Sequence, residues 1–203
     1  PGVVLVQGAA PGLGPQYGAF NITPSARRRA PTLGMSSPPT KPELVCPAGS
    51  LRALQCAIDA GADAVYLGLK DATNARNFAG LNFDDAQVRD GVAHAHRRGA
   101  KVLMALNTFA DARDPMPWYR AADKAAALGA DALIVADTAV MAHCRREHPG
   151  LRLHLSVQAS ATTHAAIEFY RQRYGIQRAV LPRVLTVQQV AQVVRQSQVD
   201  IEV

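Results

Sequence analysis

The sequence contains few of the residues that build a disulfide-linked protein or a zinc site. Its three cysteines, Cys46, Cys56 and Cys144, are widely spaced, odd in number and form no CxxC pair. Disulfide frameworks and structural zinc sites need thiols in even numbers or at close, paired spacings. We therefore predict small, buried cysteines in a protein of the reducing cytoplasm.

Long apolar runs and concentrated charge are also absent. No apolar run approaches the roughly 18–20 residues that a membrane-spanning helix needs, so we predict no membrane span. Half of the net charge of +6 comes from Arg27, Arg28 and Arg29, in a stretch without acids, and the rest is dispersed over residues 41–203. Nucleic-acid sites concentrate their basic residues, so this dispersal argues against a nucleic-acid partner.

Several familiar catalytic and metal-binding motifs are missing as well. The sequence has no HExxH, no Walker A loop and no nucleophile elbow. His143 and His148 are poorly spaced for one metal ion, because side chains five residues apart do not share a face of a continuous helix. We therefore predict no metal ligands in this sequence. A triad of Ser160, His154 and Asp137 needs an assumed geometry and is not favoured.

The chain divides into two parts of different composition. Residues 1–40 hold 7 of the 13 prolines and 6 of the 15 glycines and show no periodicity, so we predict a disordered or non-native leader. Residues 41–203 instead alternate short apolar runs with helix-period stretches. We predict about seven strands, at 43–47, 63–68, 101–107, 131–137, 151–160, 178–183 and 199–203. Six helices are predicted near 50–60, 84–98, 116–128, 138–148, 162–174 and 186–197.

This alternation predicts an α/β fold with a parallel sheet. Gly61, Gly99, Gly129 and Gly175 each stand where a helix should end. "AGADAVYLG" (60–68) and "LGADALIVAD" (128–137) repeat the same order of helix end, glycine, Ala-Asp-Ala and buried strand. An open doubly wound sheet and a (β/α)8 TIM-like barrel lacking its last unit both fit this order.

The polar faces of two strands favour the barrel. Polar side chains at 154, 156, 158 and 160 alternate with apolar ones, and Asp200 and Glu202 do the same in the last run. A parallel strand covered by helices on both faces should be apolar on both faces. We therefore predict an incomplete (β/α)8 barrel, with residues 41–203 as its N-terminal part and a polar interior.

Active sites of such barrels lie at the C-terminal ends of the strands. Reading those ends, we predict Glu202, Gln158 and Asp137 as catalytic residues. The long loop after the second predicted strand is rich in amide and guanidinium groups, and long βα loops are often functional. The predicted substrate-binding residues are Asn74, Arg76, Asn77, Asn107, His154, Ser160 and Arg183.

Five blocks of sequence resemble the collagenase-like peptidase family of bacteria. They are "ELVCPAGSLRALQCAIDAGADAVYLGLKDATNARNFAGLNF" (43–83), "NTFA" (107–110), "LGADALIVAD" (128–137), "SVQASATTHAAIEFY" (156–170) and "VLPRVL" (180–185). All five occur in one register from about residue 43 to the end. Within the family they are most similar to the branch that acts in oxygen-independent ubiquinone biosynthesis.

That resemblance implies a hydroxylation function. Members of this branch are understood to carry a [4Fe–4S] cluster on four cysteines and to pair with a homologous subunit of the UbiV type. They hydroxylate a ubiquinone precursor, with prephenate as the expected oxygen donor. The family motif Glu-x-Phe-x-x-Gly-x-x-Cys would begin at Glu202, so the cluster cysteines are expected beyond Val203. Arg76 and Arg183 are candidates for binding the two carboxylates of such a donor.

Two alternatives remain within the same family. One is hydroxylation of an RNA base, which the dispersed positive charge does not favour. The other is the peptidase activity of the family's original description, for which the sequence offers no nucleophile–base motif. A cofactor-bearing hydroxylase complex is preferred, because side chains alone provide no electron carrier for this chemistry.

Overall fold

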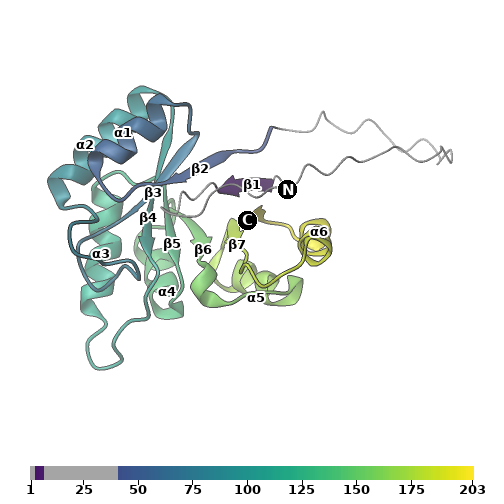
Figure 1. The fold of residues 1–203 in the computed structure, drawn as a ribbon. Coiled ribbons are helices and arrows are strands. Elements are labelled where there is room, and N and C mark those ends of the chain that lie inside the picture. The colour runs from purple at the N-terminus through teal and green to yellow at the C-terminus, as the bar shows by residue number, and fades with distance from the viewer. Residues whose placement is uncertain (1–2, 7–40) are drawn as a thin grey trace.

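The computed structural model describes residues 3–6 and 41–203, which form an α/β barrel (Figure 1). Its strands run parallel to their neighbours around the ring. Seven strands alternate with helices as predicted: β2 (Leu44–Pro47), β3 (Ala64–Gly68), β4 (Lys101–Leu106), β5 (Ala132–Val135), β6 (Arg152–Leu155), β7 (Arg178–Val180) and β8 (Asp200–Glu202). The six helices are α1 (Leu51–Asp59), α2 (Asp85–Arg97), α3 (Met116–Ala127), α4 (Thr138–Glu147), α5 (His164–Tyr174) and α6 (Val187–Gln196).

A further strand, β1 (Val3–Val6), lies between the first and last of these seven strands. It pairs in parallel with β2, with Leu5 opposite Leu44, and with β8, with Val4 opposite Glu202. The ring is therefore closed by eight strands, whereas the sequence predicted seven strands and an open gap. Residues 3–6 were not predicted as a strand, because this apolar run is only four residues long and no helix pattern follows it. The other residues of the predicted leader lie outside the described residues.

Local sequence explains where the helices end and why the GADA repeat recurs. Gly61 and Gly129 follow α1 and α3 with φ angles of 100° and 84°, a conformation that costs a glycine little. The aspartate that follows each glycine then accepts a backbone N–H from the preceding strand. Asp63 Oδ2 lies 2.7 Å from the N–H nitrogen of Leu44, and Asp131 Oδ2 lies 2.7 Å from that of Val102. The repeat thus ties adjacent strands together at the N-terminal end of the barrel.

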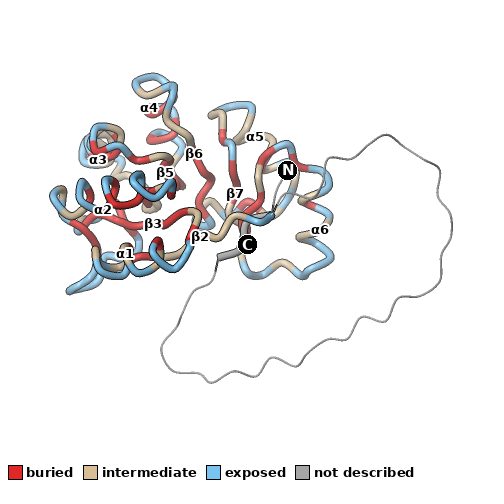
Figure 2. The backbone as a smooth tube through the Cα atoms, turned by 90° about the horizontal axis from the view of Figure 1, so that it is seen from above, coloured by how far each residue is buried: buried red, intermediate tan, exposed pale blue. Residues whose placement is uncertain are grey.

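Two apolar layers confirm which strand faces point inward. The larger cluster joins strand residues such as Leu153 and Leu155 to the helices, while a small cluster of Val45, Leu103 and Ile134 with neighbouring alanines fills the barrel. The buried positions follow the strands in Figure 2. The alternate faces of β6 and β8 therefore point into the barrel, as the alternation predicted. In the described ranges, no helix combines the length and hydrophobicity needed to cross a membrane.

Strand β6 is shorter than predicted. It ends at Leu155, and Val157–Ala159 form a short 3-10 helix, η1. Ser156 begins that helix, because its Oγ accepts the N–H of Gln158 at 3.2 Å. Such side-chain to backbone bonds compete with sheet pairing. The prediction that Gln158 and Ser160 continue the strand and point into the barrel is therefore wrong, and both residues are exposed.

Candidate functional site

A cluster of charged and polar side chains lies inside the barrel. Arg178 from β7, Glu202 from β8 and His154 from β6 are 4%, 2% and 1% exposed, respectively. Arg178 Nη1 lies 3.6 Å from Glu202 Oε2, and its Nη2 contacts the Glu43 carboxylate and lies 3.8 Å from Asp200 Oδ2. We call Arg178, Glu202, His154 and Glu43 the lumen cluster. One arginine therefore serves three carboxylates, two from β8 and one from the residue that precedes β2.

Burial and neighbouring charges shift the protonation of this cluster in different directions. Burial raises the pKa of Glu202, the Glu43 charge raises it further, and the Arg178 guanidinium only partly opposes them. Burial also raises the pKa of Glu43, but hydrogen bonds from Lys101 and Arg178 outweigh it and lower that pKa overall. For His154, burial and the positive charges of Arg178 and Arg152 lower the pKa to about 3. His154 is therefore neutral at physiological pH, and Glu202 is the carboxyl that most readily takes up a proton.

Several polar atoms of the lumen cluster have no hydrogen-bond partner among the residues that the structure describes. These are both ring nitrogens of His154, Glu202 Oε2 and Arg178 Nε. Buried polar groups are normally hydrogen-bonded, because leaving one unpaired costs roughly 1–3 kcal/mol. The barrel interior is thus suited to bind water or a polar ligand group. A neutral imidazole can donate or accept a hydrogen bond, Arg178 can face an anionic group, and Glu202 can exchange a proton.

Three predicted site residues hold the loops at the C-terminal end of the barrel: Asp137, Asn107 and Asn74. Asp137 Oδ1 caps α4 by accepting the N–H of Ala139 at 2.7 Å, and its Oδ2 accepts the N–H of Ala110 at 3.1 Å. Asn107 Oδ1 accepts the N–H of Ala75 at 2.9 Å, which ties the loop after β4 to the loop after β3. Both side chains therefore join neighbouring βα loops, and we call this set of contacts the rim network.

Asn74 anchors the long loop after β3. Its Nδ2 donates to Asn82 Oδ1 at 3.0 Å, and its Oδ1 accepts the N–H of Arg76 at 3.1 Å. The amide reaches this position because β3 ends in Gly68: a Cβ there would lie 2.0 Å from Asn74 Nδ2. Asn82 itself has φ 74°, in the left-handed region that asparagine tolerates better than most residues. Asn74 is therefore buried and engaged in loop structure.

The remaining predicted site residues are exposed around the mouth of the barrel. Arg76 and Asn77 lie in the loop after β3, Gln158 and Ser160 lie in or after η1, and Arg183 follows β7. Because β3 and β7 are four strands apart in a ring of eight, the two arginines stand on opposite sides of the mouth. The structure thus separates the predicted residues into an interior group, a loop-holding group and an exposed group.

The sequence reading missed Arg178 and Glu43, which hold the lumen cluster together. The available signal was the charge at the first residue of several strands. Charged side chains open β4, β6, β7 and β8 and immediately precede β2. In a barrel these strand starts converge at one end, so opposite charges on inward-facing positions are expected to pair.

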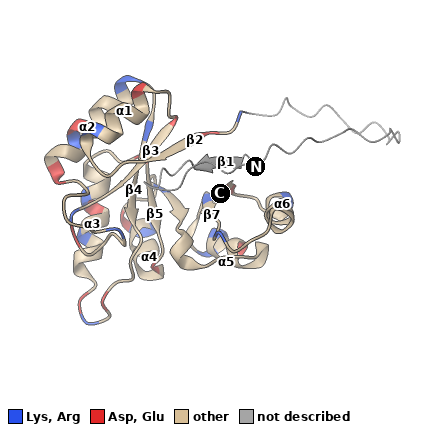
Figure 3. Ribbon diagram, viewed as in Figure 1, with Lys and Arg blue, Asp and Glu red and all other residues tan. Residues whose placement is uncertain are grey.

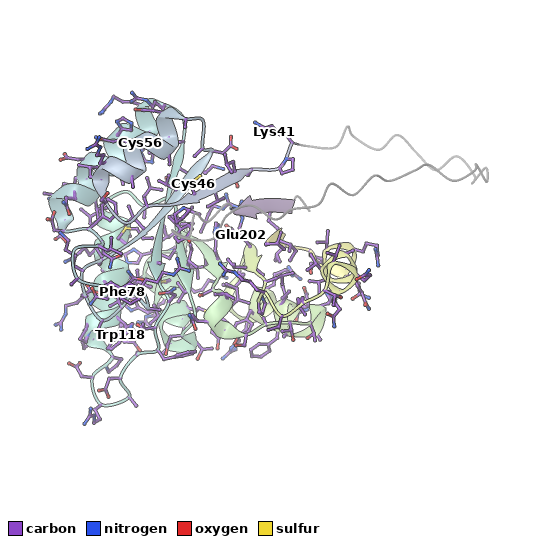
Figure 4. All side chains as sticks on the ribbon, in the orientation of Figure 1. Lys41, Cys46, Cys56, Phe78, Trp118 and Glu202 are labelled. Carbon is purple, nitrogen blue, oxygen red and sulfur yellow. The ribbon has the colours of Figure 1, made fainter. Side chains whose placement is uncertain are left out.

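The cysteines do not fit an iron–sulfur cluster. Cys46 lies on β2 and Cys56 is exposed on α1 (Figure 4), whereas Cys144 is buried on α4. Four convergent thiolates are the usual ligands of a [4Fe–4S] cluster. Within residues 3–6 and 41–203, no three cysteine, histidine or acidic ligand atoms that include a thiol converge closely enough to hold a metal. The described residues therefore provide no cluster site.

The fold and its interior cluster define a TIM-like (β/α) barrel protein. Solved barrel enzymes share this architecture: thiamine phosphate pyrophosphorylase from Pyrococcus furiosus superposes with a TM-score of 0.53, at 11% identity, covering 78% of this chain and 72% of that one. At that identity the likeness concerns the fold alone. The sequence profile described as Peptidase family U32 matches residues 49–203, and the chain belongs to this family.

Curated relatives place the chain beside hydroxylation proteins and a collagenase. It is 34% identical to tRNA hydroxylation protein P of Haemophilus influenzae, over 80% of this chain and 34% of that protein. It is also 34% identical to tRNA hydroxylation protein P1 of Bacillus subtilis, over 80% and 37%. Collagenase of Porphyromonas gingivalis is 30% identical, over 73% and 34%. The chain thus spans about a third of the length of these relatives.

Proposed function

We propose that this chain forms the barrel of a hydroxylation protein. The observation that carries the proposal is its 34% identity to two proteins named for tRNA hydroxylation, across four fifths of the chain. The lumen cluster supports the proposal, because a barrel with unpaired polar atoms inside is built to receive a polar ligand. Adding a hydroxyl group to a ring requires proton removal, which a carboxyl with a raised pKa can assist.

Each group of residues has a proposed role. Glu202 moves the proton, His154 and Arg178 orient the polar edge of the substrate, and Asn107 and Asp137 keep the mouth in shape. Arg76 and Arg183, on opposite sides of the mouth, bind the carboxylates of an oxygen donor such as prephenate. Gln158 and Ser160 lie exposed at the same mouth, within the region where a substrate would enter.

The redox chemistry requires a cofactor that the described residues do not hold. In this proposal a [4Fe–4S] cluster, bound by cysteines outside the present sequence, supplies electron transfer. A homologous subunit of the same family is the proposed partner. The residues of this chain then contribute substrate binding and proton transfer.

Two substrates are proposed, in order. A tRNA base comes first, because two relatives carry that name. A ubiquinone precursor comes second, because the charge distribution favours a small substrate. In Figure 3 basic and acidic residues are interspersed over the helices, and no large basic face gathers on the described residues in that view. Phosphate-backbone contacts would need clustered lysine and arginine.

A hybrid protein tests the proposal. Residues 43–203 would replace the matching part of the tRNA hydroxylation protein P of Escherichia coli, and the hybrid would be expressed in a strain that lacks the native protein. We expect tRNA nucleosides that are heavier by one oxygen atom, measured by liquid chromatography and mass spectrometry. A parallel assay of quinones from anaerobic cultures, in a strain lacking anaerobic ubiquinone hydroxylation, tests the second substrate.

Variants connect the product to the lumen cluster. Glu202→Gln should lower product by about 10²-fold or more, because general acid–base groups contribute roughly 10²–10⁴-fold. Arg89→Ala, at an exposed arginine on α2, should leave it unchanged. A folded hybrid that makes neither product, or an unchanged yield in Glu202→Gln, would overturn the proposal.

The geometry does not support a peptidase in the described part of the chain. Where the ring nitrogens of its histidines have a partner, that partner is an aspartate or an arginine side chain, and none of these bonds joins an imidazole to a serine or cysteine side chain. Neither ring nitrogen of His154 has a hydrogen-bond partner within residues 41–203. A nucleophilic serine or cysteine needs an adjacent base to activate it.

A further inference from the structure

Two histidines and one aspartate meet between α3 and α4, on the outer layer of the barrel. Asp123 lies on α3, His143 lies on α4, and His148 caps the end of α4. The Nε2 atoms of both histidines lie 2.7 Å from Asp123 Oδ1. One potential ligand atom from each of the three residues falls within 4.8 Å of the other two. We call these three residues the helix-layer cluster.

The end of α4 brings the two histidines together despite their spacing. Five residues along a continuous helix would turn the side chains roughly 140° apart. The helix instead stops at Glu147, and His148 takes φ −131° and ψ 60° while its N–H still bonds Cys144 O at 2.8 Å. This bend returns the imidazole toward Asp123. The sequence predicted that His143 and His148 are poorly spaced for one metal ion, but the structure brings a ring nitrogen of each to the same Asp123 oxygen.

We propose that the helix-layer cluster binds one divalent transition-metal ion, of the Zn²⁺ or Co²⁺ class. Two imidazoles and one carboxylate are typical ligands for these ions, at about 2.0–2.1 Å. Tetrahedral ligands at that distance lie roughly 3.3 Å apart, so each Nε2 must move only about half an ångström from Asp123 Oδ1. The site is independent of the proposed hydroxylation function.

The surroundings fix two of the ligands and leave an entry path. The ring of Tyr119 stacks on that of His143, with centroids 4.6 Å apart and planes within 8°, so this imidazole is oriented in advance. The side chains of His143 and His148 are 10% and 26% exposed, whereas that of Asp123 is 46% exposed. An ion can therefore approach from solvent beside Asp123, and water can complete its coordination.

Cys144 does not supply the fourth ligand. It follows His143 in the sequence, but its side chain belongs to the buried core between sheet and helices. Burial and the negative charge of Asp123 raise the pKa of its thiol to about 12. Because its sulfur is not among the ligand atoms that converge at Asp123, His143 and His148, the proposed ligands are nitrogen and oxygen only.

Arg146 should weaken metal binding by the helix-layer cluster, and this effect can be measured. Its Nη2 lies 3.3 Å from His143 Nδ1, and its Nε lies 2.6 Å from Glu147 Oε1. Without metal, His143 can donate from Nε2 to Asp123 and accept from Arg146 at Nδ1. Once Nε2 binds an ion, the ring proton must sit on Nδ1, where it faces another donor. Arg146 must then turn away, which its 67% exposed side chain allows.

The test is a titration of the purified full chain with Co²⁺ alone, followed by displacement with Zn²⁺. We expect visible d–d absorption at one equivalent, with no sulfur charge-transfer band. His148→Ala and Asp123→Asn should each weaken binding by at least tenfold. His96→Ala is the matched control, because His96 Nε2 also pairs with a carboxylate, Asp131 Oδ2 at 2.9 Å, but this pair joins no group of three potential ligands within the described residues. Circular dichroism confirms that each variant is folded.

Substitution of Arg146 provides a readout that a merely structural cluster would not give. Arg146→Glu should tighten Co²⁺ binding by about tenfold, because a carboxylate could accept the Nδ1 proton and support the ligand. Absence of Co²⁺ binding by the parent chain would overturn the proposal. So would a thiolate charge-transfer band, equal binding by the parent and His148→Ala, or unchanged binding by Arg146→Glu.

Discussion

The lumen cluster and the helix-layer cluster use the same kinds of side chain in opposite ways. Both combine carboxylate and imidazole groups next to an arginine, which is Arg178 within the lumen cluster and Arg146 beside the helix-layer cluster. In the barrel, the His154 imidazole has no hydrogen-bond partner in the described part of the chain, and Arg178 is shared among three carboxylates. Between α3 and α4, both imidazoles meet one carboxylate at 2.7 Å. The first arrangement leaves hydrogen-bonding capacity free inside the protein, whereas the second uses it within the protein.

Exposure to solvent determines how much each of the two clusters contributes to the stability of the fold. The side chain of Arg178 is 5% exposed and that of Glu202 is 3% exposed, so the loss of one partner leaves a charge without water. The side chain of Asp123 is 46% exposed, so water can replace a lost partner there. Interactions between charges weaken as water screens them. Residue type therefore does not determine the contribution of these groups to stability; their position in the fold does.

The largest expected effect comes from removing the shared cation in the barrel. Arg178→Met should lower the free energy of unfolding by about 3–5 kcal/mol, because it leaves the buried Glu202 carboxyl without its cation. Urea unfolding followed by circular dichroism measures the change. Arg171→Met is the control, because the Arg171–Glu168 pair links partly exposed positions on one helix and should contribute much less. Equal losses in the two variants would contradict the contrast between interior and surface.

A pH series provides the next largest effect. The pKa of His154 falls from its ordinary value of 6.5 to about 3 in the folded protein, through burial and the nearby arginines. Between these values the unfolded chain binds more protons, so stability decreases as the pH falls below 6.5. The loss from this group between pH 7 and pH 5 should be about 2 kcal/mol. His154→Leu should remove that part of the pH dependence, and His96→Leu should not.

The smallest effect is expected in the outer layer. Asp123→Asn, in metal-free buffer with a chelator, should lower the free energy of unfolding by less than about 1 kcal/mol, because exposed ion pairs contribute little. Thermal and urea unfolding at neutral pH measure it. A loss as large as that of Arg178→Met would mean that the helix-layer cluster is a principal element of stability.

The elements of the fold were largely predictable, because their boundaries depend on local signals. The last helix begins after Thr186, whose side chain accepts the N–H of Gln189, and Gly61 ends the first one. Such caps act within a few residues, so the sequence displays them directly. The polar alternation of β8 also placed Glu202 inside the barrel, where the structure has it. The role of Glu202 in proton transfer stays a prediction.

The contacts that join distant segments were not predictable in the same way. Arg178 and Glu43 are 135 residues apart and meet because the barrel closes. His143 and His148 are close in sequence, but they share a partner only because the helix ends between them. Gln158 showed strand alternation, and one serine hydroxyl changed its path. In each case a tertiary contact or a single hydrogen bond outweighs the local pattern.

The rim network gives the mouth of the barrel a stiff side and a soft side. Asn107 and Asp137 link the loops after β3, β4 and β5 to one another, so one of these loops can open only if bonds to the next one break. Gln158 and Arg183, in the loops after β6 and β7, are exposed instead. A ligand that orders the soft side must reduce the conformational entropy of those loops. The loops of the stiff side have already lost that entropy on folding. Amide hydrogen exchange at Ala75 and at Ala110 should therefore be similarly slow. Entry of a ligand into the barrel should be easiest past β6 and β7.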